Sequence, residues 1–160
     1  MAVWAVVFLA LTTPLAIMVI YYDLRYMRIP NYLVLLTAIS YVATGPFLLE
    51  FSDFAYRAAL GLFILFLGFL LHLTGRIGGG DIKYMSAILP FVARSDYVDF
   101  VFILCIFGIL GVLAHRAVKW VGLAPDNWVS WKRKGAYPYG LTLGSALITY
   151  LALTGFMVFT

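Results

Sequence analysis

Long apolar runs recur along the whole sequence and leave only short polar stretches between them. Six such segments stand out, at residues 3–22, 32–49, 55–73, 82–93, 98–118 and 139–159. A helix of about 20 apolar residues crosses the ~30 Å hydrocarbon core of a bilayer. The chain is 64% hydrophobic, more than a soluble core of this size can bury. We therefore expect an all-α integral membrane protein: a polytopic bundle of six transmembrane helices, forming a single domain over residues 1–160.

The segment at 82–93 is the shortest, since its helix would reach only about 18 Å. Charge placement nevertheless favours a crossing, because cytoplasmic loops are enriched in Lys and Arg. Six spans put nine basic residues on one side and two on the other, and without this crossing the basic stretch at 116–134 would change sides. The first group is Arg25, Arg28, Arg76, Lys83, Arg116, Lys119, Lys132, Arg133 and Lys134, and the second is Arg57 and Arg94. The side with the nine is predicted to be cytoplasmic, and both termini face away from it.

The composition gives little support for a nucleic-acid partner, a metal or a cofactor. The formal charge of +4 does not indicate nucleic acid, because the basic residues lie in short loops between apolar runs. The single cysteine, Cys105, excludes an internal disulfide and a cysteine-based metal cage, and we expect it to pack between helices. His72 and His115 are expected to be packed or interfacial residues. The sequence therefore predicts no metal, no cofactor and no nucleic-acid partner, and it does not specify an oligomeric state; the bilayer and a substrate are the expected partners.

Two aspartates lie at the predicted cytoplasmic edges of membrane helices, where an ionisable residue indicates function by default. Asp23 ends the first span, where the helix dipole disfavours a carboxylate. Its structural alternative is an interfacial salt bridge to Arg25 or Arg28. Asp81 follows Gly78-Gly79-Gly80 and opens the fourth span, and its structural alternative is a helix N-cap. The three glycines would also let an extended peptide approach the backbone closely.

The predicted topology places Asp23 and Asp81 at the same membrane face, an arrangement that suits peptide hydrolysis. One carboxylate takes a proton from water while the other, protonated, donates to the scissile carbonyl oxygen. Two close carboxylates share a proton because both cannot ionise cheaply, so their apparent pKa values belong to the pair. The arrangement therefore suits an aspartic endopeptidase, beside the salt-bridge and N-cap alternatives given for the two aspartates.

Three motifs, in this order, resemble those of the type IV prepilin peptidase family, which are membrane aspartic proteases with a Gly-x-Gly-Asp motif. They are Asp-Leu-Arg-Tyr-Met-Arg-Ile-Pro-Asn at 23–31, Gly-Gly-Gly-Asp-Ile-Lys at 78–83 and Pro-Tyr-Gly at 138–140. The resemblance implies that Asp23 and Asp81 are catalytic and that Gly78 and Gly80 shape the active-site loop. Supporting roles would fall to Lys83, Pro138 and Gly140, although Pro138 and Gly140 also suit an ordinary helix-start turn.

The resemblance implies a substrate and a location as well. The substrate would be a prepilin or preflagellin-like membrane protein whose short basic leader precedes an apolar helix, cleaved at the cytoplasmic face of the inner (plasma) membrane. Longer family members carry an N-terminal region with paired cysteines, linked to methylation of the mature pilin. This chain starts at its first span, and so resembles the short peptidase-only members that serve Flp/Tad pili or archaeal preflagellins. Beyond the catalytic pair, Asp126 is the one acidic residue on that face, which leaves leader recognition unexplained.

Three other functions compete with this one. Presenilin-like and signal-peptide-peptidase-like proteases also pair Tyr-Asp, as at Tyr22-Asp23, with Gly-x-Gly-Asp, but they are longer and their third motif is Pro-Ala-Leu. A small proton- or ion-coupled transporter would use the same aspartates, but such sites tend to lie near the midplane. An assembly protein without chemistry would need them only as a cap and a salt bridge. Proteolysis or ion flux in aspartate variants separates these functions.

Overall fold

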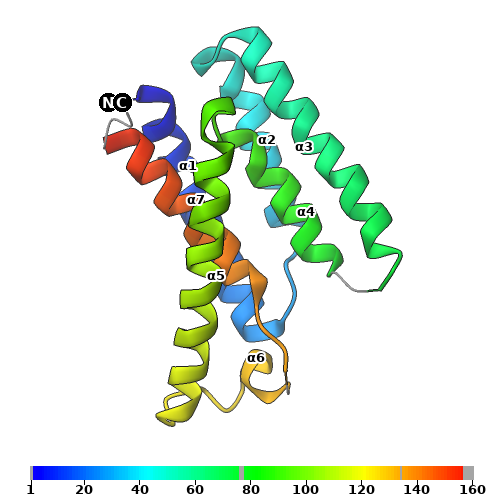
Figure 1. Ribbon diagram of the computed structural model, residues 1–160, viewed down its shortest axis with the longest axis vertical. Coiled ribbons are helices and arrows are strands. Elements are labelled where there is room, and N and C mark those ends of the chain that lie inside the picture. The colour runs from blue at the N-terminus through cyan, green and yellow to red at the C-terminus, as the bar shows by residue number, and fades with distance from the viewer. Residues whose placement is uncertain (1, 76–77, 134, 157–160) are drawn as a thin grey trace.

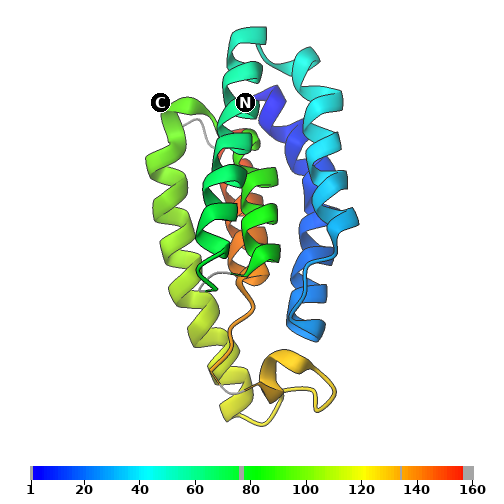
Figure 2. The same ribbon diagram turned by 90° about the vertical axis from the view of Figure 1, so that its right-hand side faces the viewer.

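The computed structural model describes residues 2–75, 78–133 and 135–156 as a bundle of helices (Figures 1 and 2). No strand occurs within these described ranges, which confirms the all-α prediction. The elements are α1 (Val3–Tyr26), α2 (Asn31–Leu48), α3 (Phe51–His72), α4 (Gly79–Ile88), the 3-10 turns η1 (Leu89–Phe91) and η2 (Arg94–Asp96), α5 (Tyr97–Trp120), α6 (Val129–Lys132) and α7 (Tyr139–Phe156).

Five of these helices, α1, α2, α3, α5 and α7, are long and apolar enough to cross a membrane. Their outward faces are apolar too, as at the exposed side chains of Leu62, Phe66 and Ile109. Five of the six predicted spans therefore coincide with helices of sufficient length. The predicted span at 82–93 is instead divided between α4 and η1, and the ten residues of α4 reach about 15 Å. Cys105 is exposed on α5, so the expectation that it packs between helices was wrong.

The chain runs up and down the bundle, and α4 takes part in this path. Figure 1 shows α3 running down from the α2–α3 connection, with α4 returning beside it toward the start of α5. The start of α1 lies against the end of α7, because a Cβ added to Gly155 would lie 3.0 Å from Cγ2 of Val6. The opposite end, where α1 ends and α4 and α7 begin, is called the site end below.

Basic residues gather at the site end in the part of the chain that the structure describes. Seven of the nine predicted to share one side lie in, or directly after, elements at that end, and the other two, Arg76 and Lys134, lie outside the described residues. Arg57 and Arg94 lie toward the other end, where Arg57 is buried and forms a salt bridge with Asp53. The charge asymmetry read from the sequence therefore corresponds to the two ends of the bundle.

The pairing of α1 with α7 forms the centre of the bundle. The two helices run antiparallel and approach closely, because a Cβ on Gly144 would lie 2.8 Å from Cγ1 of Ile20. Small residues permit such close approach of membrane helices, where dispersion contacts and not hydrophobic exclusion drive association. Half of the membrane-spanning part of α7 is buried inside the bundle, the largest share among the five long helices. The first turn of α7 is therefore held firmly against the last turns of α1.

A second close contact holds α4 against α3. A Cβ on Gly68 would lie 2.3 Å from Cγ2 of Ile82, and one on Gly61 would lie 2.9 Å from the backbone oxygen of Ser86. Phe91 in η1 then packs its ring on Phe8 of α1, with centroids 4.9 Å apart. These contacts give the short helix α4 a defined position despite its length.

We expect Gly61→Val to destabilise the fold, because the new side chain would push α3 away from the backbone of α4. The cost of such overpacking is about 1–3 kcal/mol. Thermal unfolding in detergent micelles would show it as a lowered melting temperature. Gly108→Val on α5 is the matched control, since a Cβ there meets nothing closer than 3.9 Å. Equal melting temperatures for the two variants would contradict the close α3–α4 contact.

Candidate active site

Asp23 lies one turn before the end of α1 and is 4% exposed. Its Oδ2 accepts a hydrogen bond from the backbone N–H of Gly140, with an N···O distance of 2.6 Å. Gly140 belongs to the first turn of α7, where backbone N–H groups lack intrahelical partners and the helix dipole is positive. The salt-bridge alternative is not seen, because Asp53–Arg57 is the one salt bridge found among the described residues.

The contact between Asp23 and Gly140 leaves no room for a side chain at position 140. A Cβ added there would lie 2.9 Å from both Cβ and Oδ2 of Asp23. Pro138, just before α7, is buried, and its carbonyl accepts a hydrogen bond from the N–H of Leu141 at 3.2 Å. In the third motif, Pro138 therefore stands at the start of the helix, and the backbone of Gly140 contacts Asp23.

Asp81 is the third residue of α4, whose N-cap is Gly78. The alternative in which Asp81 itself caps the helix is therefore wrong. Its carboxylate folds back over the helix start, because a Cβ on Gly78 would lie 2.7 Å from Oδ2 of Asp81. A Cβ on Gly80 would meet only Ile29, at an ordinary 3.5 Å. A side chain at Gly78 would thus require the carboxylate of Asp81 to move, whereas one at Gly80 would not. The two glycines lie at a helix start, where an active-site loop was predicted.

Both carboxyl groups line one cavity of about 1050 Å³ at the site end. Burial, and next the nearby negative charge of Asp23, raise the pKa of Asp81 to about 6. The charge of Asp23 thus disfavours ionisation of Asp81, as expected for two carboxyl groups in one cavity. The structure thus brings together in space the two aspartates that the sequence singled out.

Lys83 connects the first two motifs, because its Nζ donates a hydrogen bond to Oδ1 of Asn31 at 3.2 Å. Asn31 begins α2, directly after the turn that follows α1. Met27 makes that turn in the left-handed region, with φ of 52°. This conformation costs a non-glycine residue about 1–2 kcal/mol, and strain of this kind clusters at functional sites. The predicted supporting residue Lys83 thus ties the α1–α2 turn to α4 at the rim of the cavity.

Sequence reasoning missed several residues that line the cavity. Tyr137 lies just before α7, and its hydroxyl forms a hydrogen bond with Oγ1 of Thr142 at 2.8 Å. Burial raises the pKa of Tyr137, so it remains a neutral hydroxyl. Its position beside the third motif was an available signal. Arg28, which belongs to the first motif, also lines the cavity, as do His72 and Arg133. Nothing in the local sequence of His72 or Arg133 pointed to this site.

The described residues offer no obvious metal site, since no group of three or more His, Cys, Asp or Glu side chains gathers among them. His115 is buried, and its ring stacks on Trp131 with centroids 4.9 Å apart. The cavity offers the chemistry of one buried carboxyl group, Asp23, and one partly buried carboxyl group, Asp81, beside a lysine and several tyrosines.

Comparison with known proteins gives one family match. The model of the type IV leader peptidase family matches residues 9–113, about two thirds of the 160-residue chain. The matched range includes Asp23 and Asp81 and ends before the third motif. No curated protein and no solved structure shows significant similarity to the chain.

Proposed function

Because the chain belongs to the type IV leader peptidase family, we propose that it is an intramembrane aspartic endopeptidase with Asp23 and Asp81 as its catalytic pair. The observation that carries the proposal is the shared cavity in which these two carboxyl groups interact. The substrate is a prepilin-like or preflagellin-like membrane protein, and the product is that protein without its short basic leader.

The pair supplies both proton transfers that peptide hydrolysis needs. A water molecule between the carboxyls attacks the scissile carbonyl carbon and loses its proton to Asp23, while Asp81 donates its proton to the carbonyl oxygen. The resulting diol collapses: Asp23 passes its proton to the leaving amine and Asp81 recovers one from a hydroxyl. Placing the initial proton on Asp81 agrees with its raised pKa, and the Gly140 N–H holds Asp23 in place.

The topology that suits this function has the site end in the cytoplasm of a cell whose inner (plasma) membrane holds the bundle. In this topology, residues 82–93 form a sixth crossing. The start of α1 and the end of α7 lie at the same end of the bundle, which agrees with an even number of crossings. The basic residues at the site end agree with a cytoplasmic location. A basic leader would stay on that same side, and the whole chain acts as one peptidase domain.

The proposal is tested with membranes that contain this chain and a prepilin-like precursor. We expect membranes with wild-type protein to release the leader, and membranes with an Asp23→Asn, Asp81→Asn double variant to leave the precursor intact. The same proteins in liposomes should show no proton or ion flux that depends on the aspartates. Intact precursor with wild-type protein at normal levels would overturn the proposal. Aspartate-dependent flux without cleavage would overturn it in favour of a transporter.

The pH dependence of cleavage should follow the proton on Asp81. Its pKa is raised to about 6 because burial and the charge of Asp23 favour the neutral acid. Above that pH the acid is ionised, so kcat/KM should fall as the pH rises through about 6, and by about tenfold per pH unit well above it. A profile of initial rates from pH 5 to 9 measures this.

One control concerns the imidazole of His72, because it lines the same cavity. The basic side chains of Arg28, Lys83 and Arg133 also line the cavity. Because the fall in kcat/KM is assigned to Asp81, His72→Gln should retain it. A flat or rising profile in the wild type would contradict Asp81 as the proton donor.

A further inference from the structure

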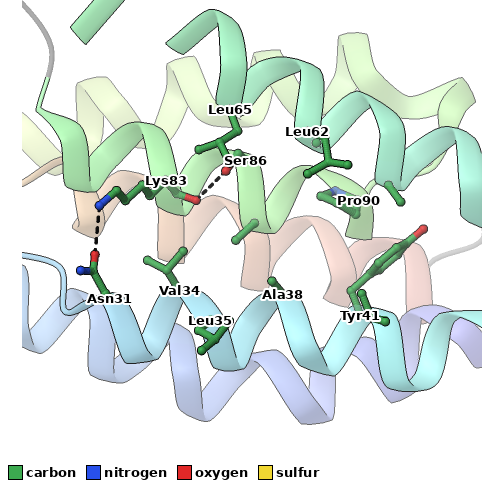
Figure 3. Close-up of a pocket in the computed structure, with 14 residues that line it drawn as sticks. Asn31, Val34, Leu35, Ala38, Tyr41, Leu62, Leu65, Lys83, Ser86 and Pro90 are labelled. Atoms are coloured by element: carbon green, nitrogen blue, oxygen red, sulfur yellow. Dashed lines mark hydrogen bonds between the residues drawn. The ribbon is translucent and has the colours of Figure 1, made fainter. Parts of the chain in front are cut away.

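Two apolar grooves flank α4. The α2–α3 groove, about 530 Å³, lies between α2 and α3 over α4 (Figure 3). The α3–α7 groove, about 460 Å³, lies on the other side, between α3 and α7. The close contact of α3 with α4 at Gly61 and Gly68 separates them. A membrane-bound substrate could therefore approach the cavity by either of two routes along α4.

The α3–α7 groove runs directly into the cavity. Gly78, Asp81 and Tyr139 line both of them. Its remaining lining is apolar, including Ile64, Leu67, Leu71, Met85 and Leu143. An apolar chain in this groove would thus reach a carboxyl group of the pair without crossing any other charged side chain of the lining.

The α2–α3 groove meets the cavity differently. Only Asn31 and Lys83 line both it and the cavity, and Figure 3 shows the hydrogen bond that joins these two side chains across the end of the groove. Neither aspartate lines it. A chain lying there would have to pass a bonded lysine before reaching the carboxyls.

The α3–α7 groove also has the direction that a membrane-embedded segment needs. Leu71 lies near the end of α3, at the level where α4 and α7 begin, and Ile64 lies two turns deeper. Met85 and Leu143 occupy the corresponding deeper positions on α4 and α7. The seven steps from Leu71 to Ile64 give the groove a length of about 10 Å along the bundle. It therefore leads from Asp81 into the interior of the bilayer.

We propose that the α3–α7 groove binds the apolar segment that follows the scissile bond of the substrate, and that this places the bond at Asp81. The inference rests on the proposed peptidase function. The apolar lining suits an apolar segment, and a basic leader is too costly to enter it. The leader therefore stays in the wide part of the cavity, beyond the carboxyls. The α2–α3 groove plays no part in binding this segment.

Two leucines of α3 offer a matched pair for testing this. Leu67 lines the α3–α7 groove and is 41% exposed, and Leu65 lines the α2–α3 groove and is 37% exposed. A photo-activated benzoylphenylalanine is placed at either position in the full chain carrying Asp23→Asn and Asp81→Asn, which holds the precursor uncleaved. We expect cross-linking to the precursor, within its apolar segment, from position 67 and not from position 65.

Cleavage kinetics give a second readout. Leu67→Trp should fill the groove and raise KM at least about tenfold, because the apolar segment loses its site. Leu65→Trp should leave KM within about twofold. Both side chains are partly exposed to the surroundings of the bundle, so both variants are expected to fold.

The outcomes separate this inference from the proposed function. If wild-type protein cleaves but position 65 alone cross-links, the segment uses the α2–α3 groove and the inference is overturned. If wild-type protein cleaves and neither position cross-links to the precursor, the grooves hold lipid chains and the inference is again overturned. If wild-type protein does not cleave at all, it is the proposed function that fails.

Discussion

Asp23→Asn and Asp81→Asn should each lower the rate of leader removal by about 10³-fold or more. An amide cannot exchange the proton that either step of hydrolysis needs, and members of a catalytic unit typically each cost this much when removed alone. The two carboxyls share one cavity and interact. The double variant should therefore be hardly slower than either single variant, because the losses are not additive.

The measurement is the initial rate of precursor cleavage in membranes with equal amounts of each variant. Asp99→Asn is the control, since Asp99 is exposed in the first turn of α5, at the opposite end from the site. It should cleave at the wild-type rate. A single variant at position 23 or 81 that retains wild-type activity would show that this aspartate is structural.

Gly140→Ala should lower kcat by about 100-fold, because the new methyl group cannot coexist with the present position of Asp23. The added Cβ would lie 2.9 Å from Cβ and Oδ2 of the aspartate, so the carboxylate or the start of α7 must move. A displacement of about 1 Å in a catalytic group can cost about 100-fold in rate. Because binding of the apolar segment is not involved, KM should change little.

Gly108→Ala is the matched control for this variant, since it makes the same replacement inside a helix where the nearest atom is 3.9 Å away. It should retain kcat. Thermal unfolding of both variants in detergent separates a misplaced carboxylate from a general loss of folding. Wild-type kcat for a folded Gly140→Ala protein would contradict the role assigned to Gly140 in positioning Asp23.

Much of the architecture could be predicted because bilayer solvation acts on short stretches of sequence. Apolar runs of sufficient length are helical in lipid, since the backbone must satisfy its own hydrogen bonds there. Five of the predicted spans correspond to α1, α2, α3, α5 and α7. The short run at 82–93 does not form one helix of membrane length. Tertiary contacts at Gly61 and Gly68 hold the short helix α4 in place, which its length alone would not do.

The candidate site also combines residues that the sequence singled out with contacts that only the packed bundle creates. Asp23 and Asp81 stand out in the sequence because a carboxylate at a helix edge is costly and demands an explanation. Their partners do not, because a backbone N–H carries no signature of the side chain it will meet. The hydrogen bond from Gly140 to Asp23, and the contact of Lys83 with Asn31, join segments far apart in the chain. Those contacts required the packed bundle.

Local sequence was therefore enough to predict the lipid environment, the helical class and the two acidic residues around which a peptidase site is proposed. Each of these follows from the local cost of placing apolar or charged groups in water or lipid. The folded bundle was needed to see that the two carboxyls share a cavity and that a glycine, not a basic residue, faces Asp23. It was also needed to see that one of the two grooves beside α4 ends at Asp81. Such features depend on close packing between distant segments, to which no single segment's composition is sensitive.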